Sequence, residues 1–207
     1  MVDVGMTSKS ILFQSSSQTV VEVSSAVKQR FPARTRLPLQ PDAIWLIQTG
    51  VVRSVTWLEN GVVVSSGIWG SGDIVGLRLS VSNPYELECL TLVEATLLPV
   101  GQGQLDTNLL LAHIHRLEEL VTIRSYRPVE TMMVKFLGWL AKQFGEAVHE
   151  GQLIDLRLTH QDIAEILGTT RVTVTRVLGQ LEQQGIIHRL AMQKILLKQE
   201  EVWHYQI

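Results

Sequence analysis

Short apolar runs separated by turn residues fill the chain between about Trp45 and Val100. Runs rich in β-branched and aromatic residues, bounded by Gly, Asn, Asp or Pro, are typical of strands. Asn60-Gly61 between two of the runs predicts a type I′ hairpin, because both central residues tolerate a positive φ. The pattern predicts a small barrel or β-roll. Its runs are Ile44–Ile47, Val51–Leu58, Val62–Val64, Ile74–Val75, Leu87–Leu92 and Ala95–Val100.

The spacing of apolar positions becomes helical after residue 104. A stripe with the spacing i, i+4, i+7 and i+11 marks one face of a first helix. Such a stripe either packs into the core of its own chain or meets a second copy. A long helix that follows a barrel needs a partner for its apolar face, so we predict a dimer interface. The stripe consists of Leu110, Ile114, Leu117 and Val121, with Leu120 beside them.

Pro128 interrupts this pattern, because the residue before a proline is pushed out of helical geometry. A second helix is predicted from Val129 to Phe144, and Gly145 can end it. Its apolar face is interpreted as core. That face consists of Met133, Phe136, Leu137, Leu140 and Phe144.

Two short helices joined by a turn are predicted within residues 158–185. Thr159 can cap the first helix, and Asp162 stands where a capping box has its acid. Gly168 can end that helix with a positive φ, and Thr170 can cap the second. Helices in this order form a helix-turn-helix. Their inward positions are Ile163, Ala164 and Leu167, then Val174, Val177, Leu178 and Leu181.

The start of the second helix has the residues that DNA reading requires. Residues 169–179 contain Arg171 and Arg176 and no acid, so this helix start can approach phosphates without local repulsion. An arginine can grip the O6 and N7 atoms of guanine with two parallel hydrogen bonds. On this pattern alone, the alternative is a helical hairpin whose arginines are merely solvated.

Two runs after the second helix predict a β-hairpin. They are Ile186–Leu190 and Lys194–Lys198, connected by residues 191–193. A hairpin in this place corresponds to the wing of a winged helix. Arg189 and Lys194 lie in the hairpin, and we expect them to be available for phosphates.

Composition narrows the class of protein. The chain has 207 residues, of which 45% are hydrophobic and 18% charged, with a formal net charge of −2 and one cysteine. These values exclude a disordered chain, a disulfide framework and a multi-cysteine metal site within one chain. No apolar run approaches the roughly 20 residues that span a bilayer, and the serine-rich N-terminus does not look like a secretory signal. We therefore expect a soluble cytoplasmic protein.

The run from Leu158 to Arg176 resembles the helix-turn-helix signature of Crp/Fnr transcription regulators, and its second half is most similar to the nitrogen-control (NtcA) branch. The resemblance covers most of the chain in order. It implies an α+β fold with an N-terminal β-roll (a cyclic-nucleotide-binding-like barrel) in residues 1–103. It further implies a long dimerisation helix in residues 104–127 and a C-terminal winged helix in residues 128–207.

The resemblance also implies roles for single residues. Arg171 and Arg176 match base-reading arginines, and Thr173 and Gln161 match phosphate contacts. Val172 replaces the acid of the cyclic-AMP-responsive branch, and it cannot accept a hydrogen bond from cytosine. The nitrogen-control branch shares this valine, which implies half-sites of the form GTA facing TAC. Two small hydroxyl residues match the surface of the helices, namely Thr159 and Thr175.

Cyclic nucleotide binding is not expected. Barrels of this family that bind cyclic nucleotide carry a Gly-Glu pair and an Arg-Ser-Ala cassette, whereas Leu77 follows Gly76 here and that cassette is missing. Residues 41–100 hold two arginines, no lysine and six acids. Two of those acids, Glu86 and Glu88, would repel a phosphate near the expected cassette.

Iron–sulfur and haem cofactors are not expected either. A cluster needs several thiolates and the chain has Cys89 alone, while no histidine precedes His113 as a haem ligand in the barrel. We interpret Cys89 as a buried, inert thiol rather than a redox switch. A 2-oxoglutarate site stays open. Its arginine–glutamate pairing is not evident, because Glu118 is near the acid position and His113 stands where the arginine would be.

No sequence motif points to an enzyme. The six histidines are dispersed without HExxH, and there is no Gly-x-Ser-x-Gly elbow, P-loop or dinucleotide fingerprint. We expect no metal site and predict a sequence-specific DNA-binding transcription regulator. It would act as a homodimer on a palindromic promoter site, with double-stranded DNA as partner, RNA polymerase as a candidate partner and no membrane. The alternative is an interaction module whose winged helix docks a protein.

Overall fold

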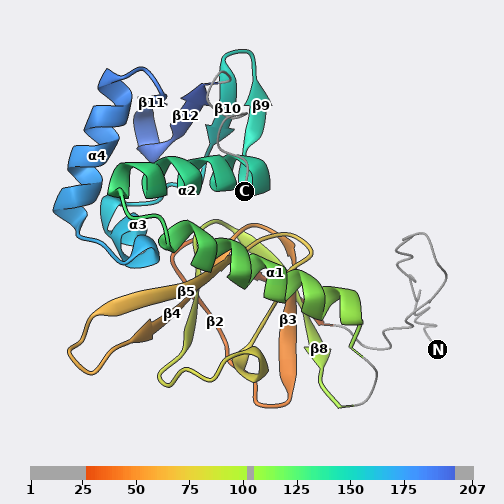
Figure 1. The fold of residues 1–207 in the computed structure, drawn as a ribbon. Helices are drawn as coiled ribbons and strands as arrows, with labels where there is room; N and C mark the ends of the chain where they lie inside the picture. Colours follow the sequence, from red (N-terminus) through yellow and green to blue (C-terminus); the bar gives the residue numbers. More distant parts are fainter. Residues whose placement is uncertain (1–26, 102–104, 199–207) are drawn as a thin grey trace, which may run out of the picture.

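The computed structural model describes residues 27–101 and 105–198 (Figure 1). The expectation for the serine-rich N-terminus falls outside these ranges. The N-terminal part consists of two four-stranded antiparallel sheets, and a short 3-10 helix, η1 (Leu77–Leu79), follows β6. One sheet has the order β1 (Val27–Phe31), β8 (Val93–Pro99), β3 (Ala43–Thr49) and β6 (Ile74–Val75). The other has the order β2 (Arg36–Leu37), β7 (Glu86–Cys89), β4 (Val52–Trp57) and β5 (Val63–Trp69).

The predicted β-roll is confirmed, and apolar side chains from both sheets fill its interior. Alternation along each strand sends every second side chain inward. In β7, Leu87 and Cys89 are buried, whereas Glu86 and Glu88 are only partly buried. The core also contains Trp45, Val52, Trp69, Val75, Val93 and Ala95.

The hairpin at Asn60-Gly61 exists, but its turn type was predicted wrongly. Strands β4 and β5 pair from Val52↔Trp69 to Trp57↔Val63. Gly61 has a φ of 78°, whereas Asn60 is not among the residues with positive φ. The Gly61 amide donates to the Leu58 carbonyl at 2.8 Å and closes the turn before the glycine. A single left-handed glycine after a tight turn matches the longer hairpin loop and not type I′.

Two helices follow the β-roll: α1 (Thr107–Arg124) and α2 (Val129–Phe144). Helix α1 lies across the β-roll, and α2 turns back above α1 toward the C-terminal strands (Figure 1). Asp106 caps α1 by accepting the Asn108 amide at 2.9 Å. Pro128 precedes α2, so the predicted break is confirmed. The predicted inner face of α2 is buried, apart from the partly buried Phe144.

The C-terminal part contains α3 (His160–Leu167), α4 (Arg171–Gln183) and a four-stranded sheet. Its strands β11 (Ile187–Arg189) and β12 (Ile195–Lys198) form the predicted wing hairpin, with the 3-10 helix η2 (Ala191–Gln193) between them. Strands β9 (Glu146–Val148) and β10 (Gly151–Ile154), which extend this sheet, were not predicted. One hydrophobic cluster joins α2, α3, α4 and the sheet, and it also includes Val51, Ile68 and Leu90 of the β-roll. Among the described helices, none combines the length and the apolar character needed to cross a bilayer.

Candidate nucleic-acid interface

Local hydrogen bonds hold the helix-turn-helix as the sequence predicts. The Thr159 hydroxyl accepts the Asp162 amide at 3.0 Å, and the Asp162 carboxylate accepts the Thr159 amide at 2.8 Å, which completes the capping box. Gly168 ends α3 with φ 66°, a left-handed conformation that favours glycine. Thr170 then caps α4 by accepting the Thr173 amide at 3.2 Å. The angle between the two helices therefore depends on a short turn capped on both sides.

The start of α4 presents a solvent-exposed face. Arg171, Val172, Thr175 and Arg176 are all exposed, and Val172 retains 78% of its surface. The Arg176 guanidinium donates to the Gln180 amide oxygen at 2.9 Å. Within residues 27–101 and 105–198, neither of these arginines forms an ion pair with a carboxylate. That these two cations bind an external anion stays a prediction.

The threonines and the glutamine have more local partners than the sequence showed. The Thr175 hydroxyl donates to the Arg171 carbonyl at 3.0 Å, and the Thr173 hydroxyl lies 2.9 Å from that of Thr170. Gln161 is exposed, and its amide donates to Glu165 at 2.9 Å. Thr159 uses its hydroxyl as a helix cap. Thr159 and Thr170 therefore fix the two helix starts, whereas Gln161 and Thr175 form hydrogen bonds within their own helices.

The prediction that Arg189 and Lys194 of the wing are available for phosphates is wrong for the free protein, because both form ion pairs. Arg189 pairs with Glu182 at 2.5 Å, and Lys194 lies 2.7 Å from Asp155. The hydrogen bond from Arg189 lowers the pKa of the Glu182 carboxyl, so the acid stays charged and keeps its partner. A phosphate would have to compete with a carboxylate at each position. The sequence showed the cations but not the acids that fold back on them.

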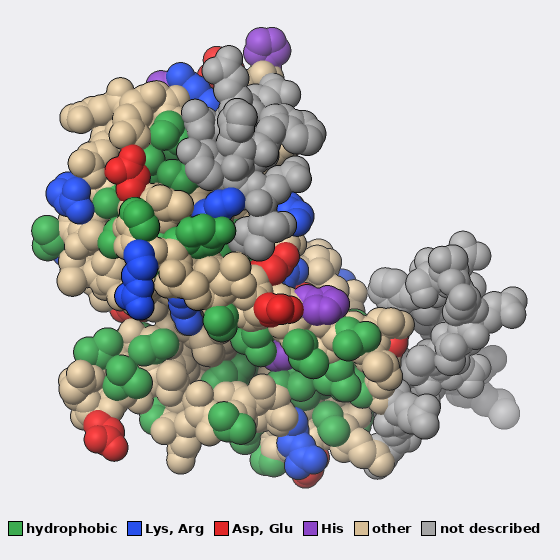
Figure 2. All heavy atoms as spheres, in the orientation of Figure 1, with side chains coloured by type: hydrophobic (Ala, Val, Ile, Leu, Met, Phe, Trp, Pro, Cys, Tyr) green, Lys and Arg blue, Asp and Glu red, His purple; other side chains and the backbone are tan. Residues whose placement is uncertain are grey.

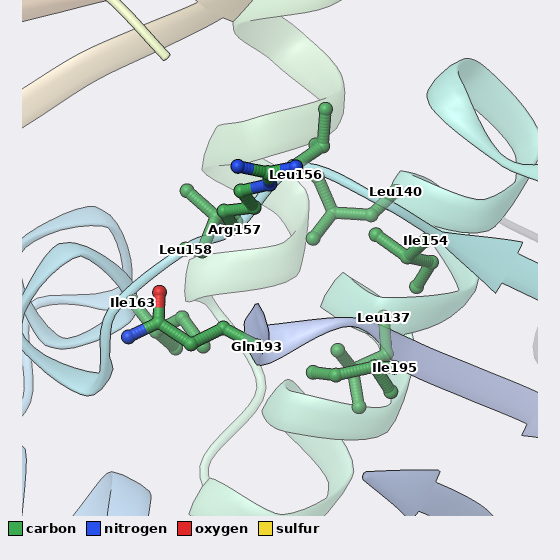
Figure 3. A pocket seen from close by; sticks show the side chains of 9 residues that line it. All are labelled: Leu137, Leu140, Ile154, Leu156, Arg157, Leu158, Ile163, Gln193 and Ile195. Carbon is green, nitrogen blue, oxygen red and sulfur yellow. The ribbon is translucent and has the colours of Figure 1, made fainter. Parts of the chain in front are cut away.

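A small cavity of about 10 Å³ lies beneath the connection of the wing (Figure 3). Leu137, Leu140 and Ile154 line it, and Gln193 extends from the wing toward Ile163 (Figure 3). This volume is about that of one water probe, so it is too small for an organic ligand. It marks where the wing is held against α2 and α3.

An ion-pair network that the sequence did not reveal fixes α3 to the β-roll. Arg53 on β4 lies 2.7 Å from Glu88, 2.9 Å from Glu165 and 3.2 Å from Asp162. Arg34 adds ion pairs with Glu88 at 3.3 Å and with Asp162 at 3.0 Å. Burial alone would raise the pKa of Asp162, but the Thr159 amide and the two arginines outweigh burial and lower the pKa. Asp162 is therefore an anion that serves α3 and the domain contact together.

The sequence held one signal of this network. Arg53 stands inside the apolar run of β4, where a charged side chain is unusual and needs a partner if it is buried. In the structure Arg53 is 8% exposed. Arg124 at the end of α1 strengthens the same junction. Its guanidinium donates to the Ile166 carbonyl at 2.5 Å and to the Ser65 carbonyl of β5. The helix-turn-helix is thus held by the β-roll and by α1.

Comparisons with known proteins agree with this architecture. Residues 133–202 match the Crp-like helix-turn-helix domain. The chain is 45% identical over 160 residues to the regulatory protein CysR of Synechococcus elongatus, covering 75% of this chain and 77% of CysR. It is 28% identical over 162 residues to the global nitrogen regulator of Synechocystis sp., covering 70% and 72% of the two chains.

The chain belongs to the Crp/Fnr family of transcription regulators. Solved structures share its fold. A CRP-family transcriptional regulator from Thermus thermophilus has a TM-score of 0.73 at 18% identity, covering 86% of this chain and 95% of its own. FixK2 from Bradyrhizobium japonicum has a TM-score of 0.72 at 20% identity, covering 89% and 98%. The two relatives compared by sequence, CysR and the global nitrogen regulator, are regulatory proteins.

In this Crp/Fnr regulator, the argument that Glu86 and Glu88 would repel a phosphate inside the β-roll is wrong. Glu86 and Glu88 do not face the interior, because they form ion pairs with arginines on the outer side of the sheet. His113 is buried, stacked on Trp69 with ring centroids 4.1 Å apart, and its Nδ1 lies 3.1 Å from the Ile74 carbonyl oxygen. Burial lowers the pKa of His113, so the ring is neutral at pH 7. It acts as a packing group between α1 and the β-roll.

Cys89 lies in the core of the β-roll. Burial raises the pKa of its thiol to about 11, so the side chain stays protonated at neutral pH. A buried thiol of this kind packs like a small apolar residue. Among the described residues, no group of three or more His, Cys, Asp or Glu side chains is placed to hold a metal ion.

Proposed function

We propose that this protein is a homodimeric transcription regulator that binds a palindromic DNA site, with α4 in the major groove. The observation that carries the proposal is the exposed face of α4, where Arg171 and Arg176 lie beside a capped helix start without a carboxylate partner among the described residues. Base edges in the major groove are read by side chains at the start of such a helix. The proposal places the protein in the cytoplasm, with RNA polymerase as a further partner.

The exposed side of α1 supports the dimer. Ile114 and Val121 retain 55% and 62% of their surface, and Leu111 retains 45%. Figure 2 shows hydrophobic side chains gathered along this side of α1 and on the adjoining β-roll. The prediction that Leu120 lies in the dimer interface is wrong. This side chain is 1% exposed and packs in the core of its own chain, so it cannot face a partner. Leu110 and Leu117 are partly buried and border the open face.

Two-fold symmetry of the dimer determines the geometry of the site on DNA. Both α4 helices must face the same side of the duplex, so the half-site centres should lie about one helical turn, roughly 34 Å, apart. Arg171 or Arg176 would grip a guanine, and Val172 would touch a thymine methyl. These contacts agree with half-sites that begin G and T, as in GTA facing TAC.

The rival function is a winged helix that docks a protein partner. It would not require two unpaired arginines at the start of α4. Measuring the affinity for a random 30-base-pair duplex between 50 and 300 mM salt separates the two. Neutralised phosphates release counterions, so affinity for DNA should fall steeply as salt rises. No binding, or an affinity that does not change with salt, would support the rival.

We expect Arg176→Ala to cost roughly 1–3 kcal/mol of specific binding and to relax the preference at one guanine. Val172→Glu should shift the preference toward cytosine at the contacted step, because a carboxylate accepts from the cytosine amino group. The measurement is a binding selection on randomised duplexes at one fixed salt concentration. Lys194→Ala serves as control, because an ammonium group that pairs with Asp155 reads no base, so the selected motif should stay the same. If Arg176→Ala selected the same motif as the natural protein, α4 would not be reading bases through this arginine.

A further inference from the structure

His160, the first residue of α3, joins the two helices of the helix-turn-helix. Its Nδ1 atom lies 2.7 Å from the Thr175 hydroxyl oxygen on α4. That hydroxyl has one proton, which it donates to the Arg171 carbonyl at 3.0 Å. The hydroxyl must therefore accept from His160, so Nδ1 carries the proton in the neutral ring. This hydrogen-bond chain leaves Nε2 as the atom that gains or loses a proton.

Positive charges surround the ring on the side of α4 and the wing. Burial, Arg189 on β11 and Arg171 on α4 all lower the pKa of His160 below its ordinary value near 6.5. Arg189 is paired with Glu182 on α4. On α3 itself, Asp162 is already paired with Arg34 and Arg53. The ring is therefore neutral at pH 7 in the free protein.

We propose that His160 takes up a proton when the protein binds DNA, so that DNA affinity is coupled to pH through this residue. The proposal rests on the proposed function, since the anion that favours the protonated ring is a DNA phosphate beside the starts of α3 and α4. A nearby opposite charge favours the charged form of a histidine. The same phosphates also neutralise Arg171, which removes part of the repulsion that keeps the ring neutral.

The sign of the effect follows from linkage. Because the complex binds more protons than the free protein, affinity rises as pH falls. The rise occurs between the higher pKa of the complex and the lower pKa of the free protein, and affinity levels off outside that window. We expect the dissociation constant to be roughly tenfold lower for each subunit at pH 5.5 than at pH 8.0, because a phosphate beside the ring favours its protonated form.

The test compares the natural protein with His160→Asn. The asparagine amide can still donate to Thr175 but does not titrate, so the hydrogen bond between the helices is kept and the proton is removed. Fluorescence anisotropy with a random 30-base-pair duplex, from pH 5.5 to 8.0 at fixed salt, gives the affinity. We expect the natural protein to bind more tightly as pH falls, and His160→Asn to lose most of that dependence. His160→Gln repeats the test with a different side-chain length.

His188 on β11 provides the matched control, because it is an exposed histidine on the wing. His188→Asn should keep the full pH dependence. His160→Arg, with a permanent charge, should bind at pH 8.0 about as tightly as the natural protein binds at pH 5.5. An identical pH profile for the natural protein and His160→Asn would overturn the coupling while leaving DNA binding intact. Absence of salt-dependent duplex binding at every pH would instead overturn the proposed function.

Discussion

Arg53→Gln is expected to lower the free energy of unfolding by about 3–5 kcal/mol, because the largely buried Glu165 loses the cation it is paired with. Among the described residues, Glu88 and Asp162 then keep Arg34 as their one arginine partner. The Arg53 side chain is 9% exposed, and Asp162 and Glu165 are 6% and 11% exposed. The two acids are therefore poorly solvated once the guanidinium is gone, and Glu165 loses its ion pair with the β-roll. Urea unfolding followed by circular dichroism measures the change in stability.

Arg30→Gln is the matched control for this substitution. Arg30 also pairs with a carboxylate, Glu94, at 2.5 Å, but its side chain is 75% exposed. Exposed pairs contribute little, so the loss should be much smaller than for Arg53→Gln. Adding Glu165→Gln to Arg53→Gln should recover part of the stability, because it removes the stranded charge. Equal unfolding midpoints for Arg53→Gln and Arg30→Gln would mean that the network does not hold α3 to the β-roll.

The helix-turn-helix could be predicted from the sequence because its determinants are local. Thr159, Asp162, Gly168 and Thr170 act within a few residues of their own positions, and each adopts its predicted role. The buried positions of α3 and α4 follow the helical period for the same reason. Caps and periodicity need no knowledge of the rest of the chain.

The network at Arg53 could not be derived in the same way. Arg53 and Glu165 are 112 residues apart in sequence, and their contact depends on how α3 lies on the β-roll. The pairing of Lys194 with Asp155 on the segment after β10 is similarly non-local. Sequence reasoning identifies a buried or exposed cation, but only the fold determines which acid it meets.

For the apolar residues of α1 too, the sequence does not determine which neighbour each side chain meets. Its stripe was read correctly as apolar, yet Leu120 belongs to the core and Ile114 to the open face. Both lie near one helix face, and the period cannot say which side the β-roll covers. Strands β9 and β10 escaped notice because they are three and four residues long and include polar residues. They become part of a sheet because β10 pairs with β12 and β9 pairs with β10.

The predicted dimer interface can be tested by a substitution on the exposed apolar side of α1. Leu117 is a poor choice for it, because that side chain also packs against the core of the β-roll. Ile114 is 55% exposed in the single chain, so a charge there does not disturb the fold of the subunit. In a two-fold interface each substitution occurs twice and close to the axis. A buried, unpaired carboxylate from each subunit would then oppose association.

Ile114→Asp is expected to raise the dissociation constant of the dimer about a hundredfold, from a loss of roughly 3 kcal/mol or more. Specific DNA binding should fall with it, because one subunit reaches only one half-site. Sedimentation velocity over a range of protein concentrations gives the dimer constant, and anisotropy on the same samples gives DNA affinity. Leu92→Asp, at an exposed apolar position between β7 and β8, should leave both unchanged. An Ile114→Asp protein that stays dimeric at the concentrations where the natural protein does would place the interface elsewhere than on α1.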